Sequence, residues 1–362
     1  MANHRIKHAL RGFLSSLLFP RRAGENRVVQ LSEEETVRRC ATRIRNSIEI
    51  RIGERAVPPL PTGASKFGGC PDLPEGTEWP FSKPRDCREF HPASLNALRE
   101  ETMRELGLPR EEPPKPGPMT LLAQINLADV HPLDVQNELP ERGMLYFFYD
   151  PAPEVVWFSQ SVDEKRPGVM KVLFESGDFS GFQRREWPEE LPEEYRFSEC
   201  PLTFSSEKML PNDEDFSIYG REPADGGARL KPAENYDEIA TSLGVLSPTG
   251  RYEAPGRAGE PFLHLLGYAD LIQGPIAASL EGRFHAAAQS GLPLEASDGW
   301  RLDGASEWVL LFQFDSIWEA EIVRRTGSEL CLDDAGRLYF YIRRDDLQNR
   351  RFERTLMELQ CG

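Results

Sequence analysis

The sequence predicts a mixed α+β fold, rich in mostly antiparallel strands, built from two pseudo-symmetric halves with an added N-terminal helical region. The first observation is a pair of apolar strands that are each interrupted by a glutamine, LLAQINL at 121–127 and LLFQFDS at 310–316. The second is the glycine turn and aromatic strand that follow each of them, GMLYFF at 143–148 and GRLYFY at 336–341. Matching strands in the same order at similar spacing indicate an internal duplication.

A third and weaker match precedes each strand pair. The pattern G-x-x-D-L runs from Gly69 to Leu73 and again from Gly267 to Leu271. One repeat then spans about 66–150 and the other about 262–347. Two copies are too few for a solenoid, so we expect two half-domains that share one core or one interface.

Residues 1–31 form a basic amphipathic leader ahead of the repeats. Apolar residues within 5–22 fall at helical spacing on one face, beside several basic residues. Three interpretations stay open. The leader is a helix docked on the body or a frayed tail, a helix on an anionic membrane surface, or, least favoured, a signal peptide, for which no A-x-A cleavage site is present.

A second helix follows the leader. Ser32 and Glu35 form a capping box at its start. A stripe at Val37, Ala41, Ile44 and Ile48 predicts its buried face. The alternation in residues 48–52 then predicts a strand.

The remaining elements follow from periodicity and from glycine and proline punctuation. Helices are expected at 92–107, 236–244 and 282–292, strands at 155–159, 169–174 and 196–204, and a proline-rich loop at 109–118.

Composition limits the function. The chain has 362 residues and a net charge of −16, which argues against nucleic-acid binding because the phosphate backbone demands a basic surface. Residues 1–57 hold 12 Lys/Arg against 6 Asp/Glu, so a basic leader precedes an acidic body. No stretch of about 18 apolar residues predicts a membrane span. Six cysteines without a CxxC pair indicate reduced thiols in a cytoplasmic protein.

No strong catalytic or cofactor motif is present. The sequence lacks Walker A, GxGxxG, HExxH and GxSxG patterns. The histidines of the body are too far apart for a local zinc site, so neither a metal nor a cofactor is expected. Cys70 would be a reactive thiol only if a neighbour such as Lys66 lowered its pKa.

The recurring polar residues are the candidate site. The pleat places Gln124 and Asn126 on one face of their strand, and Gln313 and Asp315 on one face of theirs. One interpretation is structural, with the glutamine amides pairing the backbone of the loop before each strand pair. The other is functional, with these residues lining a polar cleft between the halves. The six candidate cleft residues are Lys66, Gln124, Asn126, His264, Gln313 and Asp315.

Several separated segments together resemble the bacterial YwqG-like family, a domain of unknown function. They are SKFGGCPDLPEGTEWP, LLAQINL, RGMLYFFYD, HLLGYADLIQ, DDAGRLYFYIRRDDL and the final LQCG. The resemblance covers roughly 32–362 and implies a strand-rich α+β fold and an intracellular bacterial protein, with no established reaction. Ala269 departs from it, since the family usually has a proline there.

We therefore expect an intracellular module that binds and regulates a protein partner, in an immunity-like role. The alternative is a hydrolase or small-molecule-binding enzyme with its site between the repeats. A wide cleft walled by the six candidate residues would favour the enzyme. An exposed aromatic or acidic patch would favour the binding module.

Overall fold

The computed structural model describes residues 28–82, 115–151, 168–213, 229–245, 259–290, 301–332 and 335–361, with residue 215 and a few positions between 97 and 107. The predicted leader helix and the predicted strand at 155–159 lie outside the described residues, as does most of the predicted helix at 92–107.

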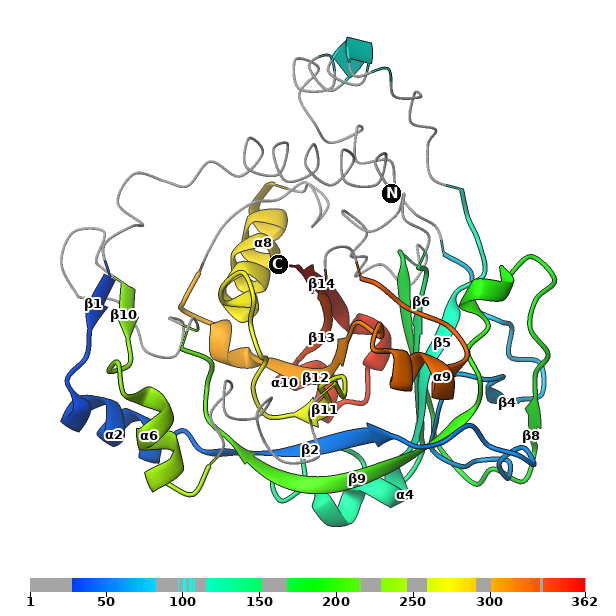
Figure 1. Ribbon diagram of the computed structural model, residues 1–362, viewed down its shortest axis with the longest axis horizontal. Helices are drawn as coiled ribbons and strands as arrows, with labels where there is room; N and C mark the ends of the chain where they lie inside the picture. The colour runs from blue at the N-terminus through cyan, green and yellow to red at the C-terminus, as the bar shows by residue number, and fades with distance from the viewer. Residues whose placement is uncertain are drawn as a thin grey trace.

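One antiparallel sheet dominates the described part of the chain. Its ten strands run in the order β14-β13-β12-β11-β2-β9-β3-β5-β6-β7 (Figure 1). They are β2 (Arg45–Ile52), β3 (Lys66–Phe67), β5 (Thr120–Asn126), β6 (Met144–Tyr149), β7 (Met170–Glu175), β9 (Cys200–Met209), β11 (Leu263–Leu266), β12 (Trp308–Asp315), β13 (Arg337–Arg343) and β14 (Leu356–Gln360). Strands and helices are both present, so the predicted mixed class is confirmed.

The sheet divides into two arms around a central pair. β2 pairs over its whole length with β9, from Leu202 to Met209. β3, β5, β6 and β7 continue from β9 and are called the first arm, whereas β11, β12, β13 and β14 continue from β2 and are called the second arm. Each arm therefore contains one strand, β7 or β14, beyond the end of the predicted repeat.

The sheet is nearly closed, so that the inner faces of the two arms meet (Figure 1). The ring of Phe147 on β6 lies 4.4 Å from that of Phe312 on β12, centroid to centroid. Phe67 on β3 stacks on Phe314 at 6.0 Å. All four side chains are fully buried. Both arms thus contribute to one apolar core, which supplies most of the driving force for folding.

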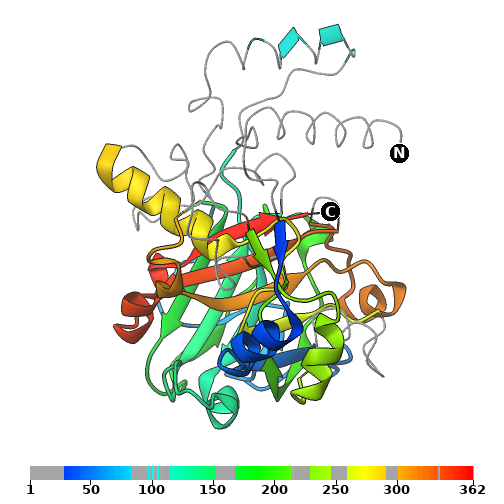
Figure 2. The same cartoon turned by 90° about the vertical axis from the view of Figure 1, so that its left-hand side faces the viewer.

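The outer face of each arm is covered differently. On the second arm, α8 (Ile276–Ser290) lies over the sheet (Figure 2). Its Ile276 and Leu280 pack with the aromatic side chains of β12 and β13. The helix begins six residues before the predicted start at 282, because these two apolar side chains give its first turns a buried face. On the first arm, β4 (Asp72–Pro74) and β8 (Phe182–Arg184) form a small sheet. Leu73 of β4 packs there on Tyr146 and Phe148.

The two arms have register shifts and backbone conformations in common at equivalent residues. The ladder of β5 with β6 shifts register between Leu121 and Ala123, and that of β12 with β13 shifts between Leu310 and Phe312. Two successive residues have positive φ where the first strand of each arm ends: Gly68 and Gly69 directly after β3, and Leu266 and Gly267 at the end of β11. A Cβ on Gly68 would lie 2.7 Å from the Cβ of Phe197, so this position also excludes a side chain sterically.

The N-terminal region forms its own small core beside the sheet. β1 (Val28–Gln30) pairs in parallel with β10 (Arg229–Lys231), and α2 (Glu33–Ala41) lies beside α6 (Tyr236–Ser242). The predicted cap is confirmed in part: the Oγ of Ser32 accepts from the N–H of Glu35 at 3.2 Å. The carboxylate of Glu35 instead pairs with Arg38 and Arg39.

The predicted buried stripe of α2 was wrong. Thr36 and Cys40 are its buried residues, and Ala41 is exposed. The reason is that the helix ends at Ala41, so that Ile48 belongs to β2 instead. Cys40 then packs with Leu210 and Tyr236.

Short helices connect the strands. They are α4 (Leu127–Val130), η2 (His131–Leu133), η3 (Glu193–Tyr195), η5 (Ala305–Glu307), α9 (Ala320–Thr326), α10 (Arg344–Gln348) and η6 (Phe352–Arg354). Among the described residues, none of the helices is both long and apolar enough to cross a bilayer.

Candidate functional site

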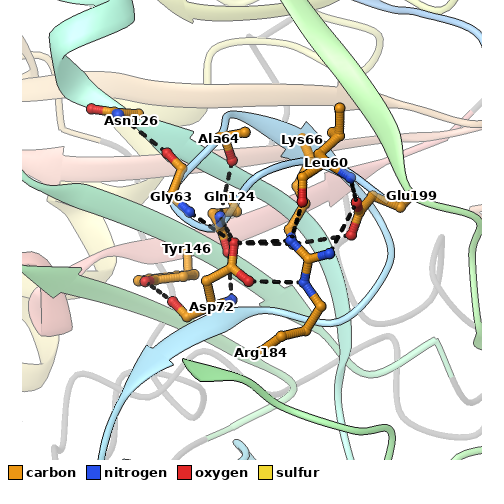
Figure 3. Close-up of polar contacts among 10 residues, drawn as sticks. All are labelled: Leu60, Gly63, Ala64, Lys66, Asp72, Gln124, Asn126, Tyr146, Arg184 and Glu199. Atoms are coloured by element: carbon orange, nitrogen blue, oxygen red, sulfur yellow. Dashed lines mark hydrogen bonds and ion pairs between the residues drawn. The ribbon is translucent and has the colours of Figure 1, made fainter. Parts of the chain in front are cut away.

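Gln124 lies at the centre of a buried polar group in the first arm, shown in Figure 3. Its Oε1 accepts from the N–H of Asp72 at 2.8 Å, and its Nε2 donates to the carbonyl of Ala64 and to Oδ2 of Asp72, both at 2.9 Å. The side chain is fully buried. The amide therefore pairs loop backbone in the way that the structural interpretation of this glutamine predicted.

Two cations and two carboxylates surround this glutamine. The Nζ of Lys66 lies 3.3 Å from Asp72 and 3.1 Å from Glu199. The Nε of Arg184 lies 2.9 Å from Asp72, and its Nη1 lies 3.4 Å from Glu199. These four residues and Gln124 are called the first cluster (Figure 3).

The first cluster is electrostatically balanced. Burial alone would raise the pKa of Asp72, but the hydrogen bonds from Arg184 and Gln124 and the charge of Lys66 hold it below its usual value. Asp72 is therefore ionised at neutral pH, opposite two cations. The hydroxyl of Tyr146 donates to the carbonyl of the same Asp72, which fixes β4 on the outer face of β6.

Asn126 acts at the end of its strand rather than in the first cluster. Its Oδ1 accepts from the N–H of Ala128 at 3.1 Å and so caps α4. Its Nδ2 donates to the carbonyl of Gly63 at 3.1 Å.

The second arm repeats part of this arrangement. Oε1 of Gln313 accepts from the N–H of Asp270 at 2.9 Å, and the hydroxyl of Tyr339 donates to the carbonyl of Asp270 at 2.6 Å. Arg337 lies between two carboxylates, 2.9 Å from Asp270 and 2.6 Å from Asp315. These five residues are called the second cluster.

Asp315 has the most perturbed carboxyl of the second cluster. Burial raises its pKa to about 6, and the nearby Asp270 adds to this effect. Arg337 and the N–H of Phe262, which donates to Oδ2 at 2.9 Å, act in the opposite direction. Burial prevails because Arg337 divides its guanidinium between two acids.

His264 takes the cross-strand place beside Gln313 that Lys66 takes beside Gln124. Both residues stand three positions before the glycine of the G-x-x-D-L pattern. The Nδ1 of His264 lies 3.1 Å from Oγ of Ser47 and 2.9 Å from the carbonyl of Leu266. The contact with Ser47 joins β11 to the central β2, and the ring also stacks on Phe262 at 4.6 Å.

The structure places the six predicted cleft residues in two separate groups. Lys66 and Gln124 belong to the first cluster, with Asn126 beside it, whereas Gln313 and Asp315 belong to the second cluster, with His264 beside it. Lys66, Gln124, His264 and Gln313 have no exposed surface. Asp315 is different, because it lines a surface recess of about 220 Å³.

The recess lies at the end of β12, where the chain turns toward α9. Asp315 and Arg337 lie on its wall together with Ile317, Trp318 and Glu319. Trp318 keeps 47% of its surface exposed. The recess therefore joins a buried ion pair to an exposed indole.

Sequence reasoning missed the partners of the glutamines. Asp72 and Asp270 stand in the recognised G-x-x-D-L pattern, and Tyr146 and Tyr339 stand in the matched aromatic strands, so a signal for these four existed. Arg184 and Glu199 lie outside both predicted repeats, and nothing in their local sequence indicates their role.

Cys70 does not meet the condition set for a reactive thiol. Burial raises its pKa, and this effect outweighs the opposing charges of Lys66 and Arg184. Among the described residues, no group of three His, Cys, Asp or Glu side chains is placed to hold a metal ion.

A comparison with protein families assigns most of the chain. The family model described as "Domain of unknown function (DUF1963)" matches residues 65–361. The matched region includes both clusters and the recess. A search of curated proteins finds no match.

Proposed function

Because the chain belongs to the DUF1963 family, a domain of unknown function, we propose its function from its own geometry: it is a module that binds and regulates a protein partner. The observation that carries this proposal is Trp318, an indole that is half-exposed beside a recess of about 220 Å³. Tryptophan is enriched among the residues that dominate binding energy at protein interfaces.

The size of the recess supports a protein partner. Pockets for small molecules and cofactors usually enclose about 300–1,000 Å³. A recess of about 220 Å³ is smaller, yet far larger than the space that one water molecule needs. It suits a single long side chain that projects from a partner.

The enzyme alternative has less support. A cleft between the repeats would need its polar residues to reach substrate, and four of the six candidates have no exposed surface. The first cluster has its charges matched, and its glutamine has its hydrogen bonds satisfied, as in a group that stabilises the fold.

We propose further that the two arms arose by internal duplication. The matched register shifts, the paired positive-φ residues and the equivalent contacts of the glutamines and tyrosines support this origin. The YwqG-like relationship, the immunity-like role and the cytoplasmic location are proposals that rest on the sequence alone.

Affinity capture from the native host tests the binding function. The full chain and two variants, Trp318→Ala and Trp187→Ala, serve as baits. Trp187 is the matched control, because it is 37% exposed and lies outside the recess. We expect a protein that the wild type and Trp187→Ala retain and that Trp318→Ala loses, with direct binding then measured by calorimetry on the purified pair. Equal retention by all three baits would contradict the proposed role of Trp318.

A further inference from the structure

The charged side chains that line the recess indicate the kind of group that it binds. Three carboxylates line it, those of Glu260, Asp315 and Glu319, against the single guanidinium of Arg337. Glu260 pairs with Arg325 at 2.5 Å, and Asp315 shares Arg337 with Asp270. Glu319 is exposed at the rim. The recess therefore presents an excess of negative charge.

One carboxylate oxygen in the recess is buried without a hydrogen bond. Asp315 is only 8% exposed, and its Oδ1 accepts no hydrogen bond from the described residues. The Nε of Arg337 lies 2.6 Å from this oxygen and pairs with it by charge. Because Arg337 also pairs with Asp270, its charge compensates Asp315 only in part, and a second cationic donor that enters the recess would gain from meeting this carboxylate.

The indole of Trp318 indicates that the donor bound in the recess is a cation. Trp318 lies beside these carboxylates, and a cation over an indole face is attracted by the ring quadrupole. Ile317 gives the same recess an apolar wall, which suits the methylene stem of a long basic side chain.

We propose that the recess between Asp315, Trp318 and Glu319 binds a lysine or arginine side chain of the partner. This rests on the proposed protein-binding function and names the chemistry of the residue recognised. The net charge of −16 favours approach by a basic partner surface.

Small cations test the site on the full chain. The probes are n-butylammonium and n-butylguanidinium, with n-butanol as the neutral control and butyrate as the anionic one. The indole N–H signal of Trp318, assigned in ¹⁵N-edited NMR spectra with a Trp318→Phe variant, reports binding. We expect at least one cation to shift this signal saturably at millimolar concentration, and neither control to do so.

Two variants with the same change in charge test the contribution of the rim. Glu319→Gln should weaken cation binding about fivefold, the factor expected for one solvent-screened ion pair. Glu307→Gln should leave it unchanged, because Glu307 is also exposed but lies at the other end of β12. Both positions are on the surface, so neither variant threatens folding.

Several results would overturn the inference. They are no saturable shift by either cation, an equal response to n-butanol, tighter binding of butyrate, or equal effects of the two glutamate variants. Failure of this inference is distinguishable from failure of the binding function. Partner capture that needs Trp318, without cation binding, would leave the protein-binding function standing. Cation binding without Trp318-dependent capture would leave the site standing.

Discussion

Replacing each repeated glutamine by leucine should destabilise the protein unequally. Gln124 accepts one hydrogen bond from the N–H of Asp72 and donates two, to the carbonyl of Ala64 and to the carboxylate of Asp72. Gln313 accepts one from Asp270, and its Nε2 has no partner among the described residues. Both side chains are fully buried, so the two positions differ chiefly in how many polar groups depend on the amide.

The expected loss in the free energy of unfolding depends on the backbone groups that each substitution leaves without a hydrogen bond. Leucine at 124 leaves the N–H of Asp72 and the carbonyl of Ala64 unpaired, at about 1–3 kcal/mol for each buried group. We expect a loss of about 3 kcal/mol, since Ala64 is only partly buried. Leucine at 313 leaves the N–H of Asp270 unpaired but also removes an amide nitrogen that was already unpaired. These two effects offset each other, and the expected loss is about 1 kcal/mol or less.

Urea unfolding of the full-length variants measures the difference through the midpoint and the slope. Gln348→Leu is the control, because Gln348 is exposed on α10 and its replacement should change stability by less than about 0.5 kcal/mol. Equal losses at 124 and 313, or a larger loss at 313, would refute the reasoning from hydrogen-bond partners.

Three further predictions concern charge and the leader. Lys66→Met should cost about 3–5 kcal/mol by the same urea assay, because it leaves the carboxylates of Asp72 and Glu199 buried with one cation fewer; a cost below about 1 kcal/mol would contradict this. Burial raises the pKa of Asp315 from 3.8 to about 6, so the folded state holds a proton that the unfolded chain releases, and stability should fall by about 3 kcal/mol as pH rises between these values. Asp315→Asn should flatten that part of the pH–stability curve, and an unchanged curve would show that the carboxyl titrates normally. Deleting residues 1–27 should leave the melting temperature nearly unchanged, whereas binding of the full chain to anionic vesicles should weaken as salt rises; a large drop in melting temperature would show that the leader is part of the core.

Local patterns in the chain could be predicted from the sequence, whereas contacts between distant segments could not. The glutamines, the aromatic strands and the correspondence of Lys66 with His264 could be predicted, since each depends on a pattern within a few residues. The roles of Arg184 and Glu199 depend on segments more than a hundred residues from Asp72 and Lys66. No periodicity within the sequence connects such positions.

The same limit applies to the recess. Asp315 could be predicted as a candidate because it occupies the place of Asn126 in the other repeat. Arg337 and Trp318 could not, because the first repeat gives no guide to them: Met144 occupies the place of Arg337. The recess thus lies where the two arms differ, and a comparison of the two predicted repeats does not find its residues.

During translation, β2 is made long before the strands that pair with it. Its two neighbours in the sheet are made much later: Asn46 contacts Ser206, 160 residues on, and Ser47 contacts His264, 217 residues on. A ribosome that adds about 5–20 residues per second needs about 10–40 s to make the second of these. During that time one edge of β2 has no native strand to pair with, and an open strand edge is a template for aggregation. A nascent chain of this protein should therefore depend on chaperones until β11 has emerged from the ribosome.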